Sequence, residues 1–444
     1  MFSSRSFVSL FFALVVSAAA ETDKPNFVFV IADDLGWADV GFHGGNAPTP
    51  HLDNLAAEGL ELTHHYVAPV CSPTRAGFLT GRCWSRFGVT TPTNSLGLPF
   101  ETMTLPKALK TQGYETCLTG KWHLGSKPEW GPGHFGFDHS YGSLAGGVTA
   151  WTHRYKVGEY SVTWHRNHEL LEEDGHVTDL LTNEAVEWIN ERSGEKPFFL
   201  YVPYTAVHLP VNEPTEWLER VPESITSDIG RHYAACIMHL DDGVGKIRAA
   251  LEKKGFAENT VFVFTSDNGG SWATNNTQPY PKDDSPSGKV TASNDPLRNQ
   301  KGSIYEGGIR VPTLVSWPAK AKTGKLSTPV CVIDWMPTFC QLAGFEQEED
   351  LNWDGVDLST MLTGGATIAD RPIYIAAARW RSVALFQDGW KLVVHEEKEP
   401  ELYHIMEDPS EKTDLASKEA DRVVEMKAAL EAARKNDKDS VAKP

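Results

Sequence analysis

The stretch NFVFVIADD, residues 26–34, is the part of the sequence that decides the fold. It is a continuous apolar run that ends in two carboxylates. This pattern is typical of a strand that is buried on both faces of a parallel sheet. Asp33 and Asp34 then lie at the carboxyl end of the strand, which is where open α/β sheets bind their ligands.

The same order of buried strand and helix recurs along the chain. TPHLDNLAAEG (49–59), TLPKALKTQG (104–113) and TDLLTNEAVEWINERSG (178–194) predict helices, and a further helix is expected over 226–255. PFFLYVPYTAVH (197–208) and TVFVFTSDNGG (260–270) predict buried strands. The alternation predicts an α/β fold with a large, doubly wound, mainly parallel sheet.

The texture of the sequence changes past about residue 365. PIYIAAA, RSVALFQ, DGWKLVVH and ELYHI predict short antiparallel strands, and a charged helix is expected over 417–436. We therefore expect a main domain over residues 21–365 and a smaller C-terminal α+β domain over residues 366–444.

The first twenty residues predict a signal peptide, because Arg5 precedes an apolar run that ends in small residues. No later apolar run is long enough to predict a membrane span. We expect an exported protein, periplasmic or extracellular in a bacterium and secretory or lysosomal in a eukaryote.

The net charge of −18 sets a condition on the substrate. A chain this acidic repels nucleic acid, so no nucleic-acid partner is expected, and an anionic substrate requires a local cationic site. The six cysteines are too few for a disulfide framework, although pairing of Cys331 with Cys340 is left open.

Four of the predicted segments deliver polar side chains to the same edge of the sheet. Asp33-Asp34, Lys121 with His123, His208 and Asp267-Asn268 each follow or end a strand. Since the carboxyl ends of parallel strands meet at one edge, we expect these side chains to converge.

One motif lies outside this strand pattern, CSPTRAGFLTGR at residues 71–82. Cys71 sits among polar residues at the start of an expected helix, which is unusual for a packing cysteine. Cys71-x-Pro73-x-Arg75 followed by Leu79-Thr80-Gly81-Arg82 resembles the signature of the sulfatases, which belong to the alkaline phosphatase superfamily. The resemblance covers nearly the whole chain after the leader.

The resemblance implies that a maturation enzyme oxidises Cys71 to Cα-formylglycine before the chain folds. The hydrated aldehyde carries two hydroxyls on one carbon. One attacks sulfur and expels the alcohol, and deprotonation of the other releases sulfate. The alternative for Cys71 is a buried or disulfide-bonded cysteine.

The resemblance also implies roles for the other candidate residues. Ca²⁺ would be held by Asp33, Asp34, Asp267 and Asn268, and hard oxygen donors suit that ion. The sulfate would be held by Lys121, Lys301 and, on a looser local match, Ser143. The expected catalytic residues besides Cys71 are Arg75, the base His123 and the proton donor His208. Without the family, the Asp pair reads as a cap or turn and Lys301 as a surface lysine.

The implied function is hydrolysis of a sulfate monoester by a sulfuric ester hydrolase of the arylsulfatase type. AWTHRYKVGEYSVTWHRNH (150–168) and ARWR (378–381) are rich in aromatic and basic residues, which favours a sulfated carbohydrate substrate, although packing explains them equally well. The alternatives are a phosphonate or phosphate monoester hydrolase of the same superfamily, and a catalytically silent, exported glycan-binding protein.

Overall fold

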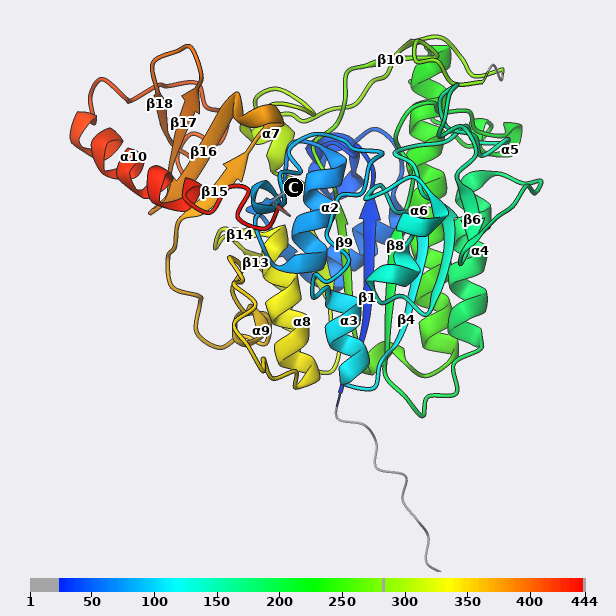
Figure 1. Cartoon of the computed structure of the whole chain (residues 1–444). Coiled ribbons are helices and arrows are strands. Elements are labelled where there is room, and N and C mark those ends of the chain that lie inside the picture. The colour runs from blue at the N-terminus through cyan, green and yellow to red at the C-terminus, as the bar shows by residue number, and fades with distance from the viewer. Residues whose placement is uncertain (1–23, 282–283, 442–444) are drawn as a thin grey trace, which may run out of the picture.

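The computed structural model describes residues 24–281 and 284–441, and its central element is the strand quoted above. This strand, β1 (Asn26–Ala32), pairs in parallel with β8 (Phe198–Pro203) on one side and with β9 (Thr260–Ser266) on the other. Figure 1 shows β1 in the middle of the main sheet. The predicted signal peptide lies outside the described residues.

The main sheet has a parallel centre and edges that contain both parallel and antiparallel pairs. Its ten strands in the described residues have the order β13-β2-β12-β9-β1-β8-β4-β5-β6-β7. The parallel centre is completed by β4 (Glu115–Lys121) and β5 (His139–Ser143). The edge strands are β2 (Leu60–Leu62), β12 (Leu314–Ser316), β13 (Gly324–Leu326), β6 (Trp164–Arg166) and β7 (Glu169–Leu170). The predicted mainly parallel α/β sheet is confirmed.

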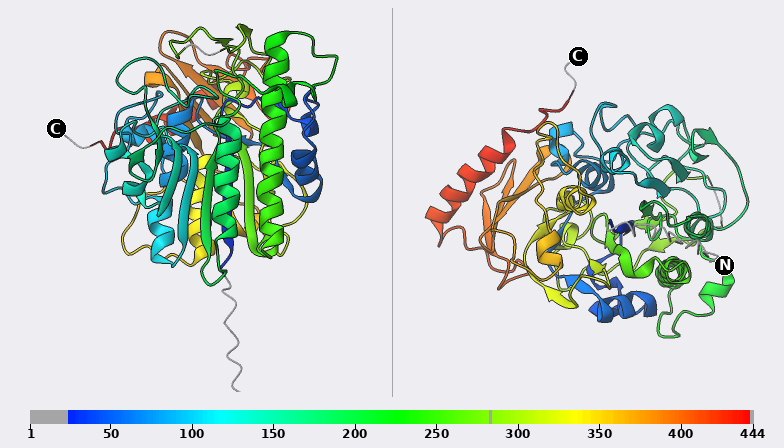
Figure 2. Two further views of the ribbon diagram at one scale, coloured as in Figure 1. Left: turned by 90° about the vertical axis from the view of Figure 1, so that its right-hand side faces the viewer. Right: turned by 90° about the horizontal axis from the view of Figure 1, so that it is seen from below.

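Alternate side chains of β1 enter two separate apolar cores, one on each face of the sheet. Phe27 and Phe29 pack with residues of α2 (Cys71–Thr80), α3 (Leu105–Thr111) and α8 (Trp335–Ala343). Val28 and Val30 pack with residues of α1 (Pro50–Glu58), α4 (Val177–Asn190) and α6 (Asp228–Lys253). The result is three layers, with helices on both faces of the sheet (Figure 2).

The four predicted helices are α1, α3, α4 and α6, with ends within a few residues of the expected ones. The two predicted strands end earlier than expected, β8 at Pro203 and β9 at Ser266. His208 and Asp267 therefore lie in loops just beyond their strands. No helix of the described residues is long and apolar enough to cross a membrane.

The C-terminal part forms a separate antiparallel sheet, as predicted. Its strands are β15 (Ile373–Ala376), β16 (Ser382–Gln387), β17 (Trp390–His395) and β18 (Glu401–His404), and α10 (Ala420–Arg434) packs against it (Figure 1). Buried Lys391 donates hydrogen bonds to Glu306 at 3.0 Å and Glu411 at 2.7 Å. This contact ties the small sheet to the main domain. The boundary between residues 365 and 366 stays a prediction.

A buried ion network joins α4, α6 and the loop that follows β8. His239 of α6 contacts Glu213 through Nδ1 at 2.8 Å and Asp179 of α4 through Nε2 at 3.1 Å. Burial alone lowers the pKa of His239, but the two carboxylates raise it to about 9. His239 is therefore an imidazolium at neutral pH, stacked on the ring of His176 with centroids 4.9 Å apart.

We predict that the stabilising effect of His239 depends on pH. Its folded pKa of about 9 exceeds the ordinary value of 6.5, so the stabilisation is complete below pH 6.5 and is lost as the pH rises through 9. His239→Gln should lower the free energy of unfolding by on the order of 3 kcal/mol more at pH 6 than at pH 10. Besides Asp179 and Glu213, the charged or titratable neighbours are His176 and Lys246, which His239→Gln leaves in place. Urea unfolding at both pH values measures the difference, and an equal loss at the two would contradict the prediction.

Candidate active site at the carboxyl ends of the strands

Backbone hydrogen bonds hold the loops after β1, β8 and β9 together. The amide of Asp33 donates to the carbonyl of Ala206 at 2.9 Å, and the amide of Val207 donates back to Asp33 at 2.8 Å. The amide of Asp267 donates to Ala32 at 3.0 Å. The strand-end residues predicted to converge are therefore fixed against one another by main-chain contacts.

The CxPxR motif opens helix α2 directly above these strand ends. Cys71 is the first residue of the helix, is 1% exposed, and its thiol donates to Asp33 Oδ1 at 3.7 Å. Arg75, four residues later and on the same helix face, donates to Asp267 Oδ2 at 2.8 Å and to the carbonyl of Lys121 at 2.6 Å. The spacing of the motif thus places the cysteine in the site and anchors the helix beside it.

Two lysines pair with the carboxylates that follow β1. Lys121 Nζ lies 2.5 Å from Asp33 Oδ2, and Lys301 Nζ lies 2.7 Å from Asp34 Oδ1. Burial, reinforced by the charge of Asp267, raises the pKa of Asp33 to about 7. Burial also acts to raise the pKa of Asp34, but the charge of Lys301 lowers it overall.

The donor set at these strand ends fits a hard divalent cation. One ligand atom from each of Asp33, Asp34, Cys71 and Asp267 lies within 4.8 Å of the others. Asn268 donates to Asp34 Oδ1 at 2.8 Å through Nδ2, while its Oδ1 is buried and has no hydrogen-bond partner among the described residues. An unpaired amide oxygen beside carboxylates is what Ca²⁺ or Mg²⁺ would bind.

A second group of possible ligands, His176, Glu213 and His239, belongs to the ion network of the fold. Both ring nitrogens of His239 already contact carboxylates, and Nδ1 of His176 accepts from the amide of Thr178 at 3.3 Å. Nε2 of His176 lies 3.6 Å from Glu213 Oε1 and has no hydrogen-bond partner among the described residues.

The two predicted catalytic histidines face the same space as Cys71, and a pair of glycines makes room for them. A Cβ atom on Gly146 would lie 2.3 Å from His123 Nε2, and one on Gly147 would lie 3.1 Å from His208 Nδ1. Burial, together with the charges of nearby lysines, lowers the pKa of both histidines, which are therefore neutral. His208 donates from Nδ1 to the carbonyl of Leu209 at 2.5 Å.

A cavity of about 240 Å³ opens onto this group of side chains. Five of the predicted site residues line it, namely Asp34, Cys71, His123, His208 and Lys301. The others lie behind this lining, where Asp33, Arg75, Lys121, Asp267 and Asn268 are buried against the first group.

Ser143, the remaining predicted site residue, does not line the cavity either. It ends β5, next to Lys121 in the sheet, and its hydroxyl accepts from the amide of Ala145 at 3.2 Å. It also lies 3.3 Å from the hydroxyl of Thr163. Its predicted contact with sulfate stays a prediction.

The sequence did not single out several residues that shape the cavity, including Gly146, Gly147 and Tyr280. Tyr155 and Lys156 also line it, and they fall within the aromatic and basic stretch 150–168. The aromatic and basic composition of this stretch was therefore a signal in the sequence for cavity-lining residues. Tyr280 lies in the long polar loop after Asp267-Asn268, where no local pattern distinguishes it.

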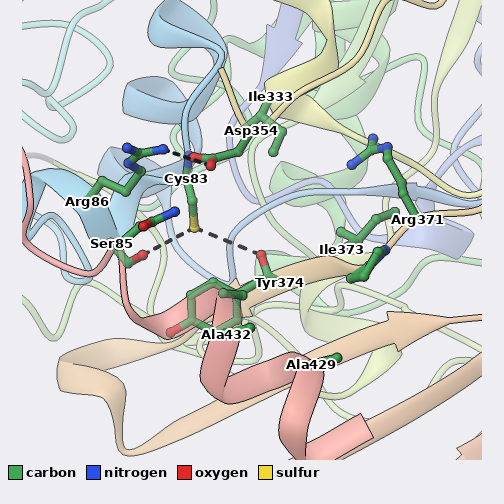
Figure 3. Close-up of a pocket in the computed structure, with 13 residues that line it drawn as sticks. Cys83, Ser85, Arg86, Ile333, Asp354, Arg371, Ile373, Tyr374, Ala429 and Ala432 are labelled. Carbon is green, nitrogen blue, oxygen red and sulfur yellow. Dashed lines mark hydrogen bonds and ion pairs between the residues drawn. The ribbon is translucent and has the colours of Figure 1, made fainter. Parts of the chain in front are cut away.

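Another cavity, of about 360 Å³, lies where α10 and the small sheet meet the main domain. Figure 3 shows Cys83 in its lining, with the thiol contacting Ser85 and the carbonyl of Tyr374. Arg86, also in its wall, pairs with Asp354 at 2.8 Å. This cavity contains none of the predicted site residues.

Comparison with known proteins identifies the class. The family model described as Sulfatase matches residues 25–345. The chain belongs to the sulfatase family and is by that membership a sulfuric ester hydrolase, so the resemblance read from the sequence is confirmed.

Particular relatives agree with this class. The chain is 36% identical to arylsulfatase J of Mus musculus over 79% of its own length, and it spans 57% of that protein. It is 34% identical to N-acetylgalactosamine-6-sulfatase of Rattus norvegicus, over 82% of this chain and 70% of that protein. The solved structure of Ps i-CgsB in complex with k-i-k-neocarrahexaose superposes with a TM-score of 0.84 at 32% identity, covering 94% of each chain.

We predict that the ion pair between Arg75 and Asp267 is important for stability. Both side chains are fully buried, so Arg75→Met leaves an uncompensated carboxylate and should cost about 3–5 kcal/mol in the free energy of unfolding. The matched control is Lys110→Met, because Lys110 pairs with Asp138 at the surface and should cost less than about 1 kcal/mol. Urea unfolding of both variants measures the two losses in free energy of unfolding. Losses that are small and similar would show that the buried pair is not important for stability.

Proposed function

We propose that this protein hydrolyses a sulfate monoester to an alcohol and inorganic sulfate, with Cys71 converted to Cα-formylglycine. The observation that carries the proposal is the position of Cys71. It starts α2 in the same cavity as His123, His208 and Lys301, directly beside the buried carboxylates. A cysteine kept for packing alone would not require cationic and imidazole groups around it.

The side chains around Cys71 suit the separate tasks of the reaction. Lys301, which lines the cavity, and Lys121, which is buried behind the lining, are the cations proposed to hold sulfate oxygens. Arg75 fixes the start of α2 against Asp267. His123 is neutral and can accept a proton, which is the role of a base in sulfate release. His208 is proposed to protonate the departing oxygen from Nε2. Because its Nδ1 donates to Leu209 and the ring is neutral in the free protein, this role requires Nε2 to take up a proton when the anionic substrate binds. The hydrated aldehyde supplies the attacking hydroxyl and a second hydroxyl for release of sulfate.

We propose Ca²⁺ as the metal, held by Asp33, Asp34, Asp267 and Asn268. The buried Oδ1 of Asn268, without a partner among the described residues, supports this donor set. When bound, the cation supplies positive charge for sulfate oxygens and for the nucleophilic hydroxyl.

The proposed substrate is a sulfated carbohydrate. Its support is the relatives named above, one described as an N-acetylgalactosamine-6-sulfatase and one solved with a bound neocarrahexaose. Tyr155 and Tyr280 on the cavity wall suit contact with sugar rings. We further propose an exported protein whose Cys71 meets its maturation enzyme before folding, when the side chain is not yet buried.

Hydrolysis of a phosphonate or phosphate monoester is the competing activity. The phosphonate monoester hydrolase of Agrobacterium radiobacter shares the fold, with a TM-score of 0.63 at 17% identity. A third possibility is glycan binding without catalysis. Parallel kinetics with an aryl sulfate, an aryl phosphate and an aryl phosphonate separate the two hydrolases, and the absence of all turnover would favour binding.

We predict that Cys71→Ala abolishes hydrolysis of 4-nitrophenyl sulfate, lowering kcat by at least about a thousandfold, because the nucleophile is removed. Mass spectrometry of the wild-type peptide that contains position 71 should show the aldehyde in protein from a host with the maturation enzyme. Cys83→Ala is the matched control, since Cys83 is a buried thiol in the other cavity, and it should keep its activity. Undiminished turnover by Cys71→Ala would disprove the mechanism.

We predict that Ca²⁺ raises the melting temperature of protein stripped with a chelator. A ligand at about a hundred times its Kd adds about 2.7 kcal/mol, which corresponds to a few degrees. Asn268→Ala should remove most of the rise. Asn259→Ala, at the opposite end of β9, should keep it. A wild-type melting temperature that does not respond to Ca²⁺, or a full response in Asn268→Ala, would argue against the site.

A further inference from the structure

Two loops that are far apart in the sequence form one wall of the cavity above Cys71. The amide of Val157 donates to the carbonyl of Pro279 at 2.7 Å, which ties the loop after β5 to the loop after β9. Beside this bond the rings of Tyr155 and Tyr280 meet edge to face, with centroids 5.8 Å apart and planes at 88°. The wall is therefore a built feature, held by both main-chain and ring contacts.

Lys156, in this wall, is a cation that has no carboxylate partner among the described residues. Its Nζ lies 5.5 Å from the ring centre of Tyr155 and 5.8 Å from that of Tyr280. Within residues 24–281 and 284–441 no ion pair involves Lys156, whereas Lys121 and Lys301 each pair with an aspartate. In a chain of net charge −18, an uncommitted lysine in the wall of the catalytic cavity points to an anionic ligand.

The hydroxyl of Tyr280 is the second uncommitted group of the wall. It is buried and has no hydrogen-bond partner in the part of the chain that the structure describes. The hydroxyl faces Gly147. A Cβ atom added to Gly147 would lie 2.8 Å from the hydroxyl and 3.1 Å from His208 Nδ1. A buried hydroxyl without a partner is costly, and a ligand that accepts its hydrogen bond removes that cost.

We propose that Lys156 and Tyr280 form a subsite for a second anionic group of the substrate, adjacent to the sulfate that is hydrolysed. This inference rests on the proposed function and narrows it. The substrate class becomes a saccharide that carries a second sulfate or carboxylate on the same or the neighbouring sugar. Lys156 supplies a charge-assisted hydrogen bond, Tyr280 donates a second one, and the ring of Tyr155 keeps the ammonium in place.

The test measures competitive inhibition of the hydrolysis of 4-nitrophenyl sulfate. This substrate has a single anionic group. Two matched pairs of inhibitors are used, N-acetylgalactosamine 4,6-disulfate against the 6-sulfate, and a neutral disaccharide such as lactose sulfated on both sugars against the same disaccharide sulfated on one. In the wild type the doubly charged member of at least one pair should bind about tenfold more tightly. Lys156→Gln should bring that ratio close to one and leave 4-nitrophenyl sulfate turnover within twofold. Tyr280→Phe should reduce the ratio in part.

Two control variants separate a local contact from a general effect of charge. Lys156→Arg keeps the charge and should keep the preference. Lys110→Gln removes one positive charge from an exposed site on α3 and should change neither ratio. The subsite would be overturned if the inhibitor preference were the same in the wild type and in Lys156→Gln. It would also be overturned if Lys156→Gln lost turnover of 4-nitrophenyl sulfate by as large a factor as it lost that preference.

A failure of the proposed function is distinguishable from a failure of the subsite. If the wild type hydrolyses no sulfate ester, the proposed function fails. Calorimetric titration of Cys71→Ala with the same pairs then measures binding without turnover. A preference for the doubly charged saccharides that depends on Lys156 supports the subsite, and its absence overturns it.

Discussion

Charge balance at the ends of β1 and β9 is the constraint on which the rest of the site depends. Three buried carboxylates meet there, and they repel one another strongly unless cations lie between them. Each of the three cations comes from a different segment: Arg75 from α2, Lys121 from β4, and Lys301 from the loop before α7 (Glu306–Ile309). These ion pairs form only when the helix, the sheet and the loop are all in place. The charges of the site are therefore balanced only in the complete fold.

The centre of the fold and the core of the site could be predicted because both follow from local pattern. Strands buried on two faces are apolar throughout, and parallel strands bring their carboxyl ends to one edge, so Asp33, Lys121 and Asp267 could be placed together from sequence. The edge strands could not be predicted, because segments such as β12 and β13 have three residues each and show no period. The role of Gly146 could not be predicted either. A side chain at this position would collide with the ring of His123, and only the folded chain brings the two residues together.

The stretch 150–168 shows why composition alone did not decide between packing and binding, because the structure uses it for both. Trp164 is 2% exposed and lies in the core beside the stacked ring of His153. Tyr155 and Lys156, a few residues earlier, line the cavity. Aromatic residues serve equally as core and as contact surface, and the assignment depends on which loop lies opposite. For Tyr155 that partner is Tyr280, more than a hundred residues away.

The contact of Lys391 with Glu306 and Glu411 has a consequence for the order of events during biosynthesis. Glu306 begins the short helix that follows Lys301, and two of its partners, Lys391 and Glu411, belong to the last quarter of the chain. A nascent chain that has reached only the main sheet therefore lacks two of the partners that fix this helix, although Tyr66 and Arg310 are already present. The cavity around Cys71 is likewise lined by residues as late in the chain as Lys301, so the cysteine is made well before all the residues that enclose it.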